Sequence, residues 1–84
     1  MKYTIIDFTR SECKIGLTPE TEVEKKLIEE AKKNPQPYQE TFAYHYQAAL
    51  QLRLNTNAQC LKVLDDAGYP TEVTVEYAIA NGMG

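Results

Sequence analysis

The chain has 84 residues, of which 43% are hydrophobic and 25% charged, and its formal net charge is −3. This length suits one domain with a thin core and little room for a deep substrate cavity. The composition is that of a folded globular chain, which excludes disorder, and the negative charge disfavours phosphate-rich partners.

The charges are unevenly distributed. Acidic and basic side chains balance within residues 1–33, and Lys62 is the last basic residue of the chain. Four acidic residues follow it: Asp65, Asp66, Glu72 and Glu76. The C-terminal segment is therefore predicted to present an acidic surface, which would repel phosphate groups.

The two cysteines, Cys13 and Cys60, lie far apart and form no CxxC motif, so they do not indicate a disulfide scaffold. The apolar start of the chain is interrupted at Asp7, which is typical of neither a signal peptide nor a membrane span. We expect a cytoplasmic protein in a reducing compartment, without membrane association.

Two short strands are predicted at the N-terminus. Lys2 to Phe8 is rich in β-branched and aromatic residues, and Glu12 to Leu17 alternates apolar with other residues. The polar residues between them are few, so the two segments are predicted to pair as a hairpin.

A first helix is predicted next, beginning either at Thr18-Pro19-Glu20 or at a capping box of Thr21 with Glu24. Its apolar stripe consists of Val23, Leu27, Ile28 and Ala31. Asn34-Pro35-Gln36-Pro37 ends it, because proline disfavours helical conformation in the preceding residue.

The longest helical pattern spans Tyr38 to Leu54. Aromatic and aliphatic residues recur there every four positions: Tyr38, Phe42, Tyr46, Leu50 and Leu54. This spacing predicts a core helix around which the rest of the chain packs.

A third helix is predicted over residues 57–67. Thr56 and Gln59 form a possible capping box, and Gly68 is a typical C-terminal stop. Cys60, Leu61, Leu64 and Ala67 would lie on one side of this helix.

Thr71 to Ala80 alternates apolar and polar residues and therefore predicts a strand. The predicted fold class is α+β, a small antiparallel sheet from the N-terminal strands and the C-terminal strand, packed by three helices. As an edge strand, Thr71 to Ala80 would be able to pair with a second copy, giving a homodimer. Asn81–Gly84 is predicted to be a frayed tail.

One segment, Leu64 to Gly82, resembles part of a ubiquitin-associated domain, with Ala67-Gly68-Tyr69-Pro70 as the loop between two helices. The resemblance implies that Thr71 to Ala80 is helical. It is thus an alternative to the predicted strand.

The chain offers two candidate catalytic residues, His45 and Cys60. If the second and third helices were antiparallel, His45 would lie near Asp65 or Asp66 as a structural latch and too far from Cys60 for a nucleophilic pair. No metal-ligand, phosphate-loop or nucleophile motif is present. We therefore expect no cofactor, no metal and no enzymatic activity.

Acidic residues in the last turn of the predicted third helix would face the negative end of its dipole. Such a local violation is often functional. Asp65 and Asp66 are therefore interpreted as an acidic patch for a basic partner, together with Glu72 and Glu76. Tyr69 and Tyr44 are expected to serve as interface anchors.

The favoured function is a non-enzymatic interaction module, a small acidic regulator or inhibitor that occupies a basic surface of a partner protein. A nucleic-acid-handling complex is one candidate setting for such a partner. Small size makes an accessory or phage-type protein the nearest analogy. Two alternatives remain: a nucleic-acid-associated protein using the first-helix lysines Lys25, Lys26, Lys32 and Lys33, and a small enzyme using His45 or Cys60.

Overall fold

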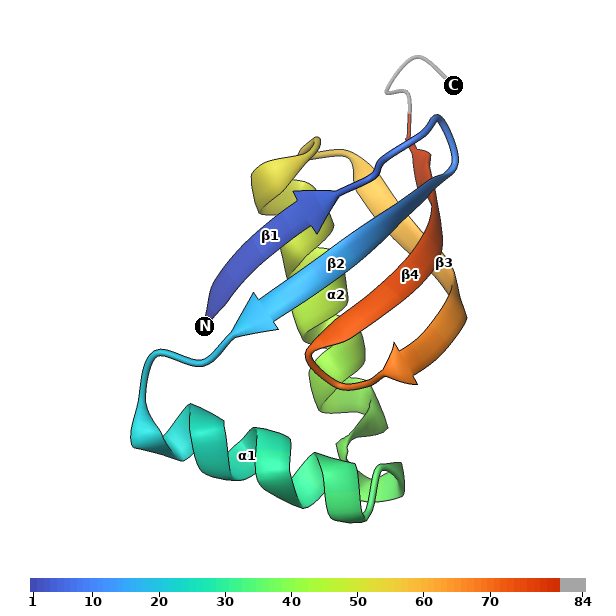
Figure 1. Ribbon diagram of the computed structural model, residues 1–84. Coiled ribbons are helices and arrows are strands. Elements are labelled where there is room, and N and C mark those ends of the chain that lie inside the picture. The colour runs from blue at the N-terminus through green and yellow to red at the C-terminus, as the bar shows by residue number, and fades with distance from the viewer. Residues whose placement is uncertain (81–84) are drawn as a thin grey trace.

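The computed structural model describes residues 1–80 as a four-stranded sheet with two α-helices (Figure 1). Along the chain the elements are β1 (Lys2–Ile6), β2 (Glu12–Thr18), α1 (Glu22–Lys33), the 3-10 turn η1 (Gln36–Tyr38), α2 (Gln39–Arg53), β3 (Ala58–Gly68) and β4 (Glu72–Ile79). The general α+β class is as predicted. The expected three helices are wrong, because there are two.

The sheet is antiparallel, with the strand order β1-β2-β4-β3. It consists of two hairpins, β1-β2 and β3-β4, which join where β2 pairs with β4. The predicted N-terminal hairpin and the predicted C-terminal strand are both present. However, β4 lies inside the sheet, so it is not the edge strand through which a homodimer was expected to form. The two edges are β1 and β3.

Helix α2 covers one face of the sheet and lies behind it in Figure 1. Phe42, Tyr46, Ala49 and Leu50 are its buried residues. They pack against side chains from the inner face of the sheet, among them Ile15, Val73 and Val75. The predicted central helix is therefore confirmed.

Helix α1 lies at one end of the sheet (Figure 1). Its N-cap is Thr21, whose hydroxyl accepts a hydrogen bond from the Glu24 backbone N–H, at 3.1 Å. The later of the two predicted starts is the correct one. Only the C-terminal half of the predicted stripe is in the core, since Ile28 and Ala31 are buried whereas Val23 is 78% exposed.

The predicted third helix is wrong, because residues 58–68 form strand β3. The strand register shifts at three places: between Cys60 and Lys62, between Val63 and Asp65, and between Asp65 and Gly68. Ala58, Cys60 and Val63 pair with Ile79, Tyr77 and Val75. The register shifts thus change the spacing of the inward residues from two to three, and this removes the strict alternation by which a strand is recognised.

Two other interpretations change with it. Asp65 and Asp66 lie in a strand, so they do not oppose a helix dipole. Charged side chains on an edge strand commonly protect it from aggregation. The resemblance to a ubiquitin-associated domain is also overturned, because the segment that had to be helical is strand β4. The predicted tail Asn81–Gly84 lies outside the described residues.

The turn between β3 and β4 is tied to α2 by one buried hydrogen bond. The Tyr46 hydroxyl donates to the Pro70 carbonyl at 2.8 Å, and both residues are buried. Because the Tyr46→Phe variant leaves this carbonyl without its partner, we expect a loss of about 1–3 kcal/mol in the free energy of unfolding.

Urea unfolding followed by circular dichroism measures this change. Tyr44→Phe is the matched control, since Tyr44 lies on the same helix but is 70% exposed; it should change stability by less than about 0.5 kcal/mol. Equal effects of the two substitutions would show that the Tyr46 hydrogen bond does not hold the turn.

Candidate functional site

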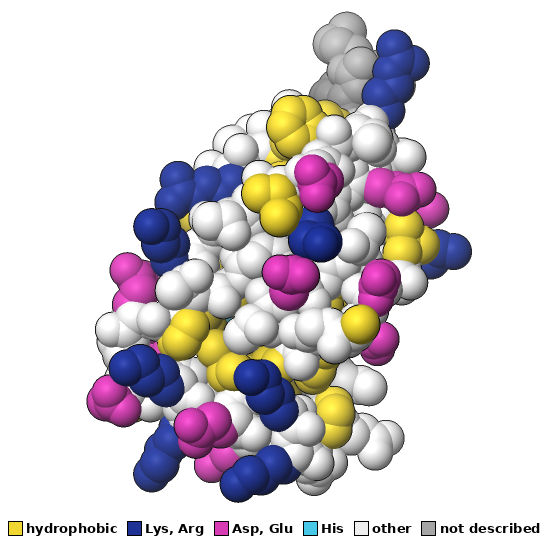
Figure 2. All heavy atoms as spheres, in the orientation of Figure 1, with side chains coloured by type: hydrophobic (Ala, Val, Ile, Leu, Met, Phe, Trp, Pro, Cys, Tyr) yellow, Lys and Arg dark blue, Asp and Glu magenta, His cyan; other side chains and the backbone are white. Residues whose placement is uncertain are grey.

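The face of the sheet opposite α2 is polar. Residues on this open face alternate with the buried residues of β2 and β4. The charged ones on β2, β4 and the facing part of β3 are Glu12, Lys14, Glu72, Glu76, Lys62 and Asp65. Figure 2, in the orientation of Figure 1, shows acidic, basic and isolated hydrophobic side chains interspersed over the surface. We refer to this surface as the open face.

Two acidic residues of the open face stand directly opposite each other. Glu12 of β2 pairs in register with Glu76 of β4. Nearby, Lys14 Nζ lies 3.5 Å from Glu72 Oε1 and is engaged in that ion pair. Within residues 1–80, neither Glu12 nor Glu76 has a basic group within ion-pair distance. Lys62 of β3 is in register with Glu76 on its other side, so the acidic pair has one basic cross-strand neighbour on the open face.

The predicted site residues divide into three groups. Glu72, Glu76 and Asp65 belong to the open face, since Asp65 pairs with Thr74, which lies between the two glutamates. Asp66 and Tyr69 line a groove beside α2. Tyr44 lies against His45, with ring centroids 5.8 Å apart. The predicted acidic patch is therefore not one continuous surface.

Strand β3 is the more exposed edge of the sheet. All of its residues from Leu61 to Gly68 are exposed, including three large hydrophobic ones. Leu61 is 55%, Val63 43% and Leu64 41% exposed. Exposed apolar edge strands tend to pair with other chains. Surface residues on β3 are therefore candidates for contact with a partner.

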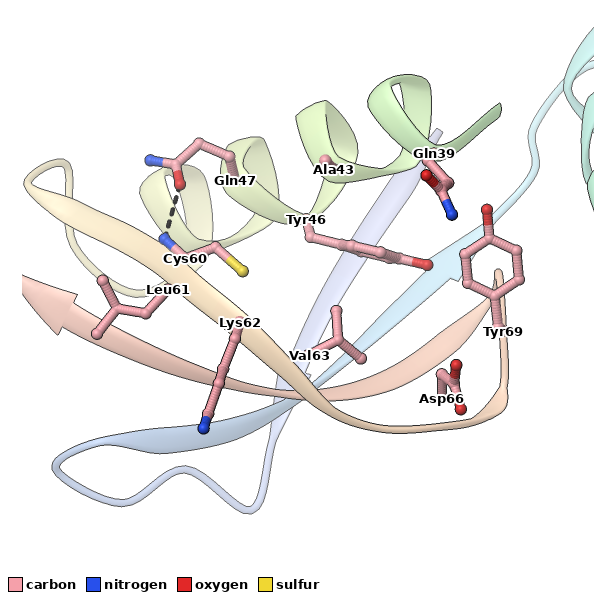
Figure 3. Close-up of a pocket in the computed structure, with 10 residues that line it drawn as sticks. All are labelled: Gln39, Ala43, Tyr46, Gln47, Cys60, Leu61, Lys62, Val63, Asp66 and Tyr69. Carbon is pink, nitrogen blue, oxygen red and sulfur yellow. Dashed lines mark hydrogen bonds between the residues drawn. The ribbon is translucent and has the colours of Figure 1, made fainter. Parts of the chain in front are cut away.

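The start of this edge is already covered by one side chain of α2. Gln47 Nε2 donates to the Ala58 carbonyl at 2.8 Å. Gln47 Oε1 accepts from the Cys60 backbone N–H, also at 2.8 Å (Figure 3). The amide thus supplies the pair of hydrogen bonds that a neighbouring strand would make. The edge is closed as far as Cys60.

A groove of about 510 Å³ runs between α2 and β3. Its walls are drawn in Figure 3: Gln39, Ala43, Tyr46, Gln47, Cys60, Leu61, Lys62, Val63, Asp66 and Tyr69. The lining is mainly apolar and includes the charged residue Asp66, whereas the side chain of Lys62 points away from α2 (Figure 3). The Tyr69 hydroxyl is buried and has no hydrogen-bond partner within residues 1–80, and burial raises its pKa.

His45 is bound to strand β1. Its Nδ1 lies 2.9 Å from the Tyr3 hydroxyl, and its ring also contacts Phe42. The expected latch from His45 to Asp65 or Asp66 is wrong, because the predicted helix that would have carried these aspartates is a strand at the far edge of the sheet. Cys60 is on that strand too. No Cys–His nucleophilic pair is therefore assembled within the described residues.

The thiols are protonated at neutral pH. Burial raises the pKa of Cys13 to about 11 and also raises that of Cys60. Both cysteines are free, and β4 separates the strands that carry them. In residues 1–80, no group of three or more acidic, histidine or cysteine side chains is placed to hold a metal ion. No helix in that range has the length and apolarity needed to cross a membrane.

No protein-family model, curated protein or solved structure matches the chain. The geometry of the open face and of the β3 edge is therefore the basis for a functional proposal.

The importance of Gln47 can be tested by removing only its hydrogen bonds. Gln47→Met keeps the length of the side chain but leaves the Ala58 carbonyl and the Cys60 N–H unpaired. We expect a loss of about 1–3 kcal/mol in the free energy of unfolding.

Chemical denaturation of both Gln47→Met and the control Gln51→Met measures this loss. Gln51 lies on the same helix and is exposed, so its substitution should be close to neutral. Comparable stability of Gln47→Met and the native chain would contradict the assigned contact.

The burial of His45 predicts a pH dependence. Desolvation is the main cause that lowers its pKa below the ordinary 6.5, the N-terminal charge adds to this, and Glu24 acts against it. The unfolded chain therefore takes up the proton more readily than the folded one. The stability contributed by neutral His45 is present above pH of about 6.5 and is lost as the pH falls.

Thermal unfolding between pH 7 and 5 should accordingly show a steeper decrease of Tm for the native chain than for His45→Gln. The Gln variant is expected to start from a lower Tm at pH 7, because it loses the contact with Tyr3. Parallel Tm profiles would mean that His45 titrates equally in the folded and unfolded states.

Two residues of the site were missed in the sequence. The sequence around Gln47 does not indicate its role, because glutamine is common on helix surfaces. The backbone groups that it binds belong to strand β3, which is separate in the sequence. Glu12 was counted only in the balanced N-terminal charge. Its significance depends on the register between β2 and β4, which nothing in either strand alone specifies.

Proposed function

We propose that the chain is a non-enzymatic protein-interaction module whose open face binds a basic surface of a partner protein. Support comes from the chemistry of this face, which is solvated and which neither helix of residues 1–80 covers (Figure 1). Of the six charged residues named on this face, four are acidic and two are basic. Such a surface fits a regulator or inhibitor that occupies a basic groove, including one that otherwise binds nucleic acid.

The pairing of Glu12 with Glu76 is the observation that carries the proposal. Like charges directly opposite each other on neighbouring strands destabilise a sheet. Lys62 of β3 is in register with Glu76 and offsets this repulsion in part. An acidic arrangement that its own sheet neutralises only in part is expected where a surface serves binding. A lysine or arginine of a partner placed between these carboxylates would remove the repulsion, so binding would be favoured by the strain it relieves.

The lysines of α1 give weaker support for the nucleic-acid alternative. Acidic residues are interspersed with them along the helix, and Lys25 Nζ lies 3.3 Å from Glu22 Oε1. Phosphate binding needs basic groups that are free to replace counterions. The open face is therefore preferred as the binding surface.

The repulsion itself can be measured in the isolated chain. Glu12→Gln keeps the shape of the side chain and removes one of the two opposed charges. It should raise the free energy of unfolding by about 0.2–1 kcal/mol. Urea unfolding provides the measurement, with Glu29→Gln on α1 as a control that should not stabilise.

Partner binding is tested with two variants of equal charge. The first carries Glu12→Lys, Glu72→Lys and Glu76→Lys on the open face. The second carries Glu22→Lys, Glu29→Lys and Glu40→Lys on the helices. Tagged native and variant chains are used to capture proteins from a native lysate, at low and high salt and with and without nuclease. Captured proteins are then identified by mass spectrometry.

The proposal predicts a protein that the native chain and the helix variant retain, and that the open-face variant loses. Retention should be weaker at high salt and insensitive to nuclease. Equal retention by both variants would contradict the open face as the binding surface. Loss of all captured proteins after nuclease treatment would instead favour nucleic acid as the partner.

A further inference from the structure

The free part of the β3 edge is short and well defined. Gln47 covers the strand up to Cys60, and the turn begins where the Tyr69 N–H donates to the Asp66 carbonyl at 2.9 Å. Between these limits Leu61 to Asp65 are all exposed, and the part that follows the first register shift is Lys62-Val63-Leu64-Asp65. We call it the free edge.

The sequence of the free edge is complementary to itself in the antiparallel direction. It runs from a basic residue through two apolar ones to an acidic one. When two copies are placed antiparallel, Lys62 of each meets Asp65 of the other, and the apolar residues meet at the centre. A peptide of different sequence would have to reproduce this order, whereas a second copy has it already.

The bulge makes this pairing possible on one face. Lys62 pairs with Glu76 and Asp65 pairs with Thr74, two residues apart on β4. Residues two apart on a strand point to the same side, and paired residues share a face. Lys62 and Asp65 therefore both lie on the open face, although three positions separate them. Without the bulge they would lie on opposite faces.

Backbone groups of the free edge are also oriented for pairing. The Tyr77 N–H donates to the Ser11 carbonyl on the β2 side, so the neighbouring Glu76 directs its backbone groups toward β3. Its partner Lys62 then faces β4, and Val63 faces outward by alternation. Two copies of Val63 can exchange hydrogen bonds across a two-fold axis.

Val63 also lines the groove beside α2. The two-fold axis that relates the copies is perpendicular to the joined sheet, so each residue stays on the same face of it. The Val63 side chain of the second copy therefore lies on the face that α2 covers, next to the groove. It would occupy part of the apolar groove. The groove adds contact area that two hydrogen-bonded strands alone lack, and specific interfaces need about 800 Å² from each partner.

We propose that the chain forms a symmetric homodimer through antiparallel pairing of the free edges, Lys62 of each copy against Asp65 of the other. The two sheets become one continuous sheet with both open faces on the same side. This inference rests on the exposed backbone edge of β3 and needs no partner protein, although Lys62 and Asp65 also belong to the open face. The strand that joins the two copies in this proposal is β3, whereas β4 was the strand expected from the sequence.

A charge exchange tests the dimer. Lys62→Asp sets two acidic residues against each other in the dimer, and Asp65→Lys sets two basic ones, so each single variant should be monomeric. Mixing the two single variants restores an opposite pair at both contacts and should give a heterodimer. The double variant should dimerise by itself. Sedimentation velocity over a concentration series measures the mass of each species. Lys26→Asp on α1 is the control and should dimerise like the native chain.

A second variant tests the backbone contact. Val63→Pro removes the outward N–H without removing a bond to β4, and proline is tolerated on edge strands. It should abolish the dimer, with circular dichroism confirming the fold. The proposal is overturned if the native chain stays monomeric up to millimolar concentration. Dimers that persist in the single charge variants and in Val63→Pro would overturn it as well.

Discussion

Strand β4 is paired on both sides, with β2 on one and β3 on the other, and the rest of the structure depends on this. The N-terminal hairpin and the C-terminal hairpin meet only there. Val73, Val75 and Tyr77 extend from β4 into the core, where α2 covers them. The sheet and its helix layer thus have a common centre in a strand near the end of the chain. Pairing over this sequence distance is entropically costly, and the buried residues of β4 compensate for it.

The same pairing produces both candidate surfaces. Because β4 is central, its outward glutamates lie between two other strands, and the register with β2 sets Glu76 opposite Glu12. Because β4 uses both of its sides, β3 is left at the edge. The bulges that interrupt β3 then place Lys62 and Asp65 on one face. The acidic open face and the free edge are therefore consequences of one topological arrangement, although each is proposed to bind a different partner.

Local patterns in the sequence were sufficient for most of the fold. The hairpin, the capping box at Thr21, the core helix and the alternating C-terminal strand all followed from spacing and residue type. The pattern failed over residues 58–68, because three register shifts interrupt the alternation that identifies a strand. The site was less predictable. Its acidic residues could be identified from the sequence, but the face on which each one lies depends on the strand register. The wrongly predicted third helix also led us to expect a contact between His45 and Asp66, whereas His45 contacts Tyr3.

The central claim is that residues 58–68 form a bulged edge strand whose outward backbone groups beyond Cys60 are free. Amide hydrogen exchange measured residue by residue in a dilute sample tests it most directly. The N–H groups of Gln59 and Lys62, which face β4, should exchange slowly, and that of Val63 should exchange quickly. Uniform protection from Leu61 to Ala67 would indicate a helix and contradict the account. Rapid exchange at Gln59 and Lys62 would contradict it too, since β3 would then not be paired with β4.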